Sequence, residues 1–288
     1  MNTNSKTKQR VVKFLLLAAF TLAPLFGANA QSESDEFGVW TTLEASKKIN
    51  KKLKLDFEAE LRTIEGVGNI ERVSLGAGAS YKFTKWLKAS AGYIFMYSHS
   101  LDETKYKWED QFEVPGYGTY CDYNVDHAYW TERHRFHITL TGEHKIGRVE
   151  FSLRERVQYT RTNSATTDET KYRWQQNYDE NTYEEIAPTL IERETEPDFK
   201  EAKHNVTLRS RLTAKWDIAN CKITPFASVE LYTRLDEWKG FDRLRYRLGA
   251  DYKIDKKNKV SLYYLFQHDN DEENTKGHAV GIGYSIDL

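Results

Sequence analysis

The chain has 288 residues, a formal net charge of −1 at pH 7 and a polar mean hydropathy of −0.73. A charge so close to zero leaves no basic footprint for nucleic acid, which we therefore exclude as a partner. After the first 30 residues the sequence contains no run of about 18 consecutive apolar residues, so helical membrane spans are excluded as well.

The N-terminus has the three parts of a secretory signal. A basic stretch from Lys6 to Lys13 precedes the apolar run Phe14–Phe26, and Ala28–Ala30 forms an A-x-A cleavage site. The alternative, a short membrane anchor, is disfavoured because the apolar run is too short to span a bilayer. We expect residues 1–30 to be removed and residues 31–288 to form one exported domain.

Apolar and charged residues alternate along most of the remaining chain. From Leu53 to Leu61 every second residue is apolar and every residue between is charged. Because successive side chains of a strand point to opposite faces, this period of two predicts strands with one apolar and one ionic face. The predicted strands are Phe37–Ala45, Leu53–Thr63, Arg72–Phe83, Leu87–Tyr97, Trp130–Gly142, Arg148–Tyr159, Lys203–Trp216, Ile223–Arg234, Arg243–Ile254, Lys259–Gln267 and His278–Leu288.

Connections between these strands alternate between short and long. The short ones are Ser46–Lys52, Thr84–Trp86, Glu143–Gly147, Asp217–Lys222 and Asp255–Asn258, and they are mostly basic. The two longest, Ser98–Tyr129 and Arg161–Glu201, are acidic. Transmembrane β-barrels have short periplasmic turns and longer extracellular loops. The pattern therefore predicts an all-β, antiparallel transmembrane barrel of ten to twelve strands in the outer membrane of a Gram-negative bacterium.

The count of eleven predicted strands conflicts with the even number of bacterial single-chain barrels. Three explanations of this odd count remain open. Phe37–Ala45 lies in or over the lumen, a long loop hides a further strand, or the count is wrong near residue 238.

The inward face is predicted to carry a charge lattice. Its principal members are Glu58, Glu60, Arg62, Arg72, Arg154, Arg156, Arg209, Arg211, Glu230, Arg243, Arg245 and Arg247, and further inward charges are Lys54, Arg133, Arg135 and Arg234. Charges in a closed interior must be paired or hydrated. The lattice either holds the wall together or lines a narrow wet pore, and its excess of arginine favours anions if the pore is open.

The two long connections share a segment. Asp102–Trp108 reads DETKYKW, and Asp168–Trp174 reads DETKYRW. The repeat indicates duplicated hairpins or two loops that pack in the same way. Tyrosine and tryptophan are frequent around both copies, which suits a binding surface for sugars or peptides, or a lid that packs on itself.

Cysteine and histidine positions argue against a disulfide and against an enzyme. The predicted topology puts Cys121 and Cys221 at opposite ends of an apolar belt about 25 Å tall, which is too far for a disulfide. We expect two free thiols, no catalytic residues, no metal and no cofactor. A hydrolase would need a serine activated by histidine, and no nucleophile motif accompanies the candidates, which are Ser98, His99, Ser100, His127, His134 and His137.

Three segments carry a family resemblance. They are Phe37-Gly38-Val39-Trp40, the run from Leu53 to Arg62, and the hairpin from Leu75-Gly76-Ala77-Gly78 to Gly92-Tyr93. They resemble the family called domain of unknown function 2490. The resemblance implies an outer-membrane β-barrel of the kind common in Bacteroidetes, and it supplies no catalytic or binding residues.

Our leading hypothesis is an outer-membrane barrel that is structural or a narrow, porin-like passive pore. The second is a barrel that binds surface partners through its acidic aromatic loops. The third is a soluble periplasmic barrel or sandwich that carries a hydrophobic ligand, with the two strand faces inverted. Expected partners of a membrane barrel are membrane lipid, lipopolysaccharide and, through the apolar strand His278–Leu288, the barrel assembly machinery. The sequence does not determine an oligomeric state.

Overall fold

The computed structural model describes residues 35–236, 240–270 and 275–288. The predicted signal segment, residues 1–30, lies outside the described residues, and so does the uncertain position near residue 238. Within the described ranges, no helix has the length and apolar character needed to cross a membrane.

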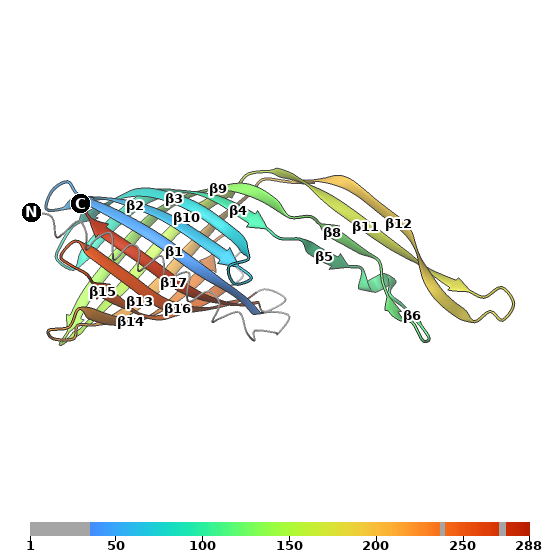
Figure 1. Ribbon diagram of the computed structural model, residues 1–288. Helices are drawn as coiled ribbons and strands as arrows, with labels where there is room; N and C mark the ends of the chain where they lie inside the picture. The colour runs from blue at the N-terminus through green and yellow to red at the C-terminus, as the bar shows by residue number, and fades with distance from the viewer. Residues whose placement is uncertain (1–34, 237–239, 271–274) are drawn as a thin grey trace, which may run out of the picture. The chain divides into compact units, whose positions relative to one another are not determined.

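The described strands form a closed barrel of eleven strands, so the prediction of an all-β barrel of ten to twelve strands is confirmed. Around the barrel the order is β1-β17-β16-β15-β14-β13-β10-β9-β4-β3-β2 (Figure 1). The barrel strands are β1 (Asp35–Lys48), β2 (Leu53–Ile64), β3 (Asn69–Lys82), β4 (Leu87–Ser100), β9 (Tyr129–Ile146), β10 (Val149–Thr162), β13 (Lys203–Trp216), β14 (Ile223–Arg234), β15 (Phe241–Lys253), β16 (Asn258–Asp269) and β17 (Lys276–Asp287).

One parallel strand pair explains how the barrel closes with an odd number of strands. In Figure 1 the blue strand β1 runs beside the red strand β17, and the two pair in parallel from Asp35↔Lys276 to Ser46↔Asp287. On its other edge β1 pairs antiparallel with β2. A ring of alternating directions cannot close with an odd number of strands unless one neighbouring pair is parallel. The explanation that put Phe37–Ala45 inside or over the lumen is therefore wrong, because this segment is part of the wall.

The two faces of the barrel strands differ as the alternation predicts. Large apolar side chains point outward, and Leu75, Ile138 and Leu248 are 60%, 70% and 68% exposed. Inward positions of the same strands carry charged, hydroxyl or small side chains, such as Ser74 beside Leu75 and Arg247 beside Leu248. The apolar surface is thus on the outside of the barrel.

Side chains within the short turns fix their backbone. Asn50 Oδ1 accepts hydrogen bonds of 2.8 Å from the backbone nitrogens of both Lys52 and Leu53. Asp255 Oδ1 accepts from Lys257 and Asn258 in the same way, at 2.8 and 2.9 Å. These local bonds replace the ladder bonds that end at a strand terminus, which is why Asn and Asp recur where hairpins turn.

The two long connections are not irregular loops but form a second compact unit, residues 97–133 and 161–204. We call it the loop unit. A four-stranded sheet within it has the order β12-β11-β8-β5, and β6 and β7 pair as a separate hairpin. Its elements are β5 (Glu103–Tyr106), the 3-10 turn η2 (Trp108–Asp110), β6 (Phe112–Val114), β7 (Gly118–Tyr120), β8 (Tyr123–Asp126), β11 (Ala165–Tyr178) and β12 (Glu185–Lys200).

The repeated segments occupy equivalent places in this sheet. The first copy contributes β5 and the second contributes part of β11, and both pair antiparallel with β8. Asp126 lies opposite Glu103 on one side and Glu169 on the other, and Tyr123 lies opposite Tyr106 and Tyr172. The two copies therefore pack in the same way, in one register, on the two edges of a shared central strand.

Candidate functional site: the charged lumen

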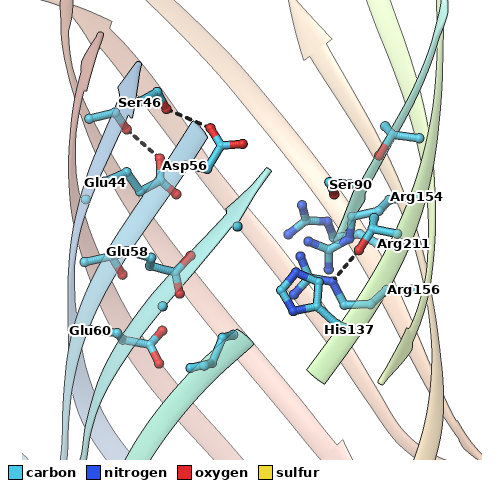
Figure 2. A pocket seen from close by; sticks show the side chains of 18 of the residues that line it. Glu44, Ser46, Asp56, Glu58, Glu60, Ser90, His137, Arg154, Arg156 and Arg211 are labelled. Carbon is cyan, nitrogen blue, oxygen red and sulfur yellow. Dashed lines mark hydrogen bonds between the residues drawn. The ribbon is translucent and has the colours of Figure 1, made fainter. Parts of the chain in front are cut away.

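A cavity of about 610 Å³ lies inside the barrel and is lined by charged and hydroxyl side chains. Its lining reaches the strand ends beside the short turns, as Lys88 at the start of β4 and Lys215 at the end of β13 show. Among the side chains labelled in Figure 2, the carboxylates lie on one wall, and Arg154, Arg156, Arg211 and His137 lie on the other.

The acidic wall comes from the adjacent strands β1 and β2, with Glu44, Asp56, Glu58 and Glu60 in sequence positions that alternate with outward apolar residues. Asp56 accepts hydrogen bonds from the hydroxyls of Ser46 (3.0 Å) and Ser80 (2.8 Å). Lys54 also lies 3.4 Å from Asp56, so this carboxylate is partly neutralised as well as oriented by hydroxyl donors.

The basic wall comes from β9, β10 and β13, which are neighbours in the barrel. Arg135 Nε donates to Thr160 Oγ1 at 3.1 Å, and Arg156 Nε donates to Thr139 Oγ1 at 2.9 Å. These two bonds run in opposite directions between β9 and β10 and hold both side chains against the wall. His137, between them on β9, lies over Gly92, where any Cβ would be only 2.7 Å from its Cε1 atom. Glycine at position 92 thus leaves room for this ring, which a larger residue would push aside.

Glu230 on β14 is the buried carboxylate that most guanidinium groups share. It is 1% exposed, and four arginines lie within 4.0 Å of it. These four are Arg154, Arg209, Arg245 and Arg247. On β2, Glu60 is shared in the same way by Arg62 (2.8 Å) and Arg72 (3.2 Å). Six arginines thus depend on two carboxylates within the described lumen.

A dense layer adjoins the cavity on the side away from the short turns. We call it the Trp40 layer; it consists of Trp40, Glu230, Tyr232, Arg245 and Leu265, all buried and none part of the cavity lining. The guanidinium carbon of Arg62 lies 3.5 Å from the centre of the Trp40 ring, and that of Arg245 lies 4.9 Å from it. These buried aromatic and guanidinium groups pack together at this level, and the cavity lies on the side of the short turns.

A family model described as "Protein of unknown function (DUF2490)" matches residues 37–278. The chain belongs to this family. A search of curated proteins found no significant match.

Several solved structures are similar to this DUF2490 protein at low identity. The β-domain of the Bordetella autotransporter BrkA is 11% identical, with 82% of each chain covered and a TM-score of 0.45. The CymD monoaromatic hydrocarbon channel is 9% identical, with 83% of this chain and 85% of that chain covered and a TM-score of 0.34. An anion-selective porin from Comamonas acidovorans is 11% identical, with 84% and 83% covered and a TM-score of 0.21. Values this low establish no shared role.

The predicted lattice residues of the DUF2490 protein fall into three places. Most line the cavity: Glu58, Glu60, Arg62, Arg72, Arg154, Arg156, Arg209, Arg211 and Arg247. Glu230 and Arg245 lie in the Trp40 layer. Arg243 stands apart from the cavity and forms a two-pronged pair with Asp269, at 2.5 and 2.7 Å. Asp56 lies on the charged face predicted for Leu53–Leu61, but sequence reasoning missed Glu44 and His137 as inward residues.

The residues considered for catalysis have separate partners in the structure. His134 bonds to the Tyr93 hydroxyl at 2.7 Å, and His127 bonds to Thr170 Oγ1 at 2.7 Å. His99 stacks on Trp130. Both cysteines are free, which confirms the expectation of two free thiols; Cys121 is buried and Cys221 is exposed.

One carboxylate cluster of the loop unit has the spacing of a metal site, namely Asp126, Glu169 and Asp198. Two lysines already hold its buried member, because Lys105 and Lys200 donate to Asp126 Oδ2 at 2.8 and 2.5 Å. A cation would have to displace these ammonium groups. The cluster is therefore read as an ion-pair network that ties β5, β8 and β12 together.

This network predicts a pH window for the loop unit. Burial alone would favour the neutral acid, but hydrogen bonds from Lys105 and Lys200 hold the pKa of Asp126 below its usual value. The bond to Asp126 raises the pKa of Lys105. For Lys200 burial alone favours the neutral amine, yet its hydrogen bonds to Asp126 and Asp198 raise its pKa. The stabilisation is therefore complete between about pH 5 and pH 10, is lost as the pH falls through the lowered carboxyl pKa, and is lost again as it rises through the raised lysine pKa values.

We expect Asp126→Asn to destabilise the loop unit by about 1–3 kcal/mol, because two ammonium groups lose their shared acceptor. Limited proteolysis within residues 161–204 measures the effect; the variant should be cleaved faster than wild type at pH 7, and the difference should shrink as the pH falls through the lowered carboxyl pKa of Asp126. Glu192→Gln, at an exposed site on the same sheet, is the control. Equal cleavage of Asp126→Asn and wild type at pH 7 would contradict the assignment.

Proposed function

We propose that this protein is an integral outer-membrane β-barrel without enzymatic activity that acts as a narrow passive pore for small hydrophilic solutes. The observation that carries the proposal is the assignment of faces. Apolar side chains cover the outside of a closed barrel, while the inside holds a hydrophilic cavity. That arrangement suits a barrel surrounded by lipid and opposes a soluble carrier of hydrophobic ligands, which needs an apolar interior.

In this proposal the short turns and the end of β17 face the periplasm, and the loop unit faces the outside. Membrane lipid surrounds the apolar wall, and lipopolysaccharide is the neighbour of the acidic loop unit. The apolar residues of β17 engage the barrel assembly machinery. The Trp40 layer makes the passage narrow, and the arginine excess of the lumen favours anions.

The bilayer location is tested with a matched pair of substitutions. Leu248 in the barrel wall and Ile191 in the loop unit are both exposed, at 68% and 58%. Leu248→Arg should lower the free energy of unfolding in lipid vesicles by about 2–4 kcal/mol, because a charge at mid-membrane depth is costly. Ile191→Arg should change it by less than about 0.5 kcal/mol, as for an ordinary surface site. Equal, small effects of both substitutions would refute the membrane proposal.

The pore is tested by single-channel recording of the folded full-length protein in planar bilayers, after heat-modifiable migration on a gel has shown that it is folded. Small discrete steps with a preference for anions support a passive pore. A folded protein that stays silent would favour the second candidate, a surface-binding barrel. The loop unit offers one observation for that candidate: an aromatic row across β5, β8 and β11, in which Tyr123 stacks on Tyr172 with ring centres 4.5 Å apart.

A further inference from the structure

The lumen holds more positive charge than its carboxylates neutralise. Arg135, Arg156 and Arg211 line the cavity, and none of them forms an ion pair with a carboxylate in the described part of the chain. Glu230 lies directly opposite Arg211 in the register of β13 and β14, but its oxygens are occupied by Arg154 and Arg209. These three arginines therefore face the cavity without a described carboxylate at ion-pair distance.

The geometry of these arginines leaves their donors free. Arg135 and Arg156 use only Nε in their bonds to threonine, and the buried Nε of Arg211 has no acceptor. Among the described residues, no acceptor takes a hydrogen bond from the terminal nitrogens of these three side chains. Figure 2 shows Arg154, Arg156, Arg211 and His137 gathered on one wall and pointing into the cavity. Guanidinium groups with two free terminal nitrogens match the oxygens of phosphate or carboxylate in a two-pronged manner.

Like charges held together on one wall repel one another, and burying them unpaired is costly. An anion bound between Arg156 and Arg211 would remove this cost. The cavity of about 610 Å³ is much larger than one anion and falls within the range of small-molecule pockets. The opposite wall, with Glu44 and Asp56, offers acceptors for hydroxyl groups.

We propose that Arg156 and Arg211, with Arg135, Arg154 and His137 around them, bind the phosphate group of a small phosphorylated sugar, whose hydroxyl-bearing body reaches the acidic wall. This proposal deepens the proposed function, because it names the class of solute that the lumen takes up. The supporting observations are the arginines without an ion-pair partner and the carboxylates on the facing wall in Figure 2. The proposal does not depend on whether solutes can pass the Trp40 layer.

The first arm of the test uses inorganic phosphate and the folded full-length protein in detergent at low salt. Calorimetry should detect saturable binding, and the midpoint of thermal unfolding should rise with phosphate. Arg156→Gln/Arg211→Gln should weaken phosphate binding at least tenfold. Without phosphate the same variant should unfold at the wild-type temperature or higher, since it removes repulsion, so loss of binding is not confused with misfolding.

The matched control is Arg243→Gln, which removes an inward arginine that is paired with Asp269 and does not line the cavity. It should keep the phosphate affinity of the wild type. Phosphate that fails to bind, or that binds equally to wild type and the double variant, overturns the site.

The second arm compares glucose 6-phosphate with glucose. Binding of the phosphorylated sugar at least as tightly as phosphate, without binding of glucose, supports the solute class. Binding of phosphate but not of the sugar phosphate overturns it. Bilayer recordings on the same preparation separate the two proposals: channels without phosphate binding refute the site alone, and phosphate binding without channels refutes the pore alone.

Discussion

Replacing Glu230 by glutamine is expected to lower the free energy of unfolding of the barrel by about 3–5 kcal/mol, the cost of removing one partner from a buried ion pair. Glu230 is 1% exposed, and its two oxygens serve four guanidinium groups. It also accepts a hydrogen bond of 3.2 Å from the Tyr232 hydroxyl. A neutral amide keeps the shape of the side chain but leaves these arginines facing one another without a counter-charge.

The measurement is denaturant unfolding in detergent or lipid, read by the denaturant concentration at which the folded, heat-modifiable band disappears. Glu44→Gln is the control, because Glu44 is exposed at the wall of the cavity and accepts a hydrogen bond from the hydroxyl of Ser285 (2.7 Å). Its cost should stay below about 1 kcal/mol.

The energetic coupling between substitutions at Glu230 and Arg209 distinguishes a loss of charge balance from a loss of packing. Adding Arg209→Gln to Glu230→Gln should recover part of the lost stability, because one uncompensated charge is removed. Additive costs of the two substitutions would show that Glu230 acts through packing alone, and would contradict the charge argument.

Replacing Trp40 by alanine is expected to open the lumen. Trp40 is 7% exposed and packs with Leu265 and Ala279 in the buried cluster of the barrel. Its ring is also the platform for the guanidinium groups of Arg62 and Arg245. Removing the ring leaves a hole at the level where we propose that the Trp40 layer narrows the passage, and costs about 3–5 kcal/mol in stability.

Single-channel recording should therefore show conductance steps several-fold larger for Trp40→Ala than for wild type, and intermediate steps for Trp40→Phe. Trp86→Ala is the control, because Trp86 is 59% exposed in the short turn between β3 and β4. If folded Trp40→Ala conducts no better than wild type, the Trp40 layer is not the barrier and the narrow passage lies elsewhere.

Local sequence signals were sufficient for the wall of the barrel. The period of two in runs such as Leu53–Leu61 determines which side chains face outward, because a strand has only two faces. Asn50 and Asp255 mark hairpin turns, because their side chains accept hydrogen bonds from the turn backbone. The same parity predicts which charges point inward, and it would have found Glu44 and His137 had it been applied to every strand.

Closure of the barrel was decided by the tertiary structure. Alternation reports the faces of a strand but not its neighbours, so nothing local shows that β1 lies parallel to β17. The sheet of the loop unit escaped detection for a related reason. Its strand β12 is exposed and acidic over most of its length, so it lacks the apolar face by which strands are recognised.

The tertiary structure was also needed to determine which charged side chains form ion pairs. In sequence Arg154, Arg156, Arg209 and Arg211 are alike, each an inward residue one position from an apolar neighbour. In the barrel Arg154 and Arg209 reach Glu230, whereas Arg156 and Arg211 remain without a carboxylate. The sequence by itself determined the two faces of the strands and the excess of arginine inside. Only the tertiary structure decided which arginines are neutralised, because that depends on distances between strands far apart in the chain.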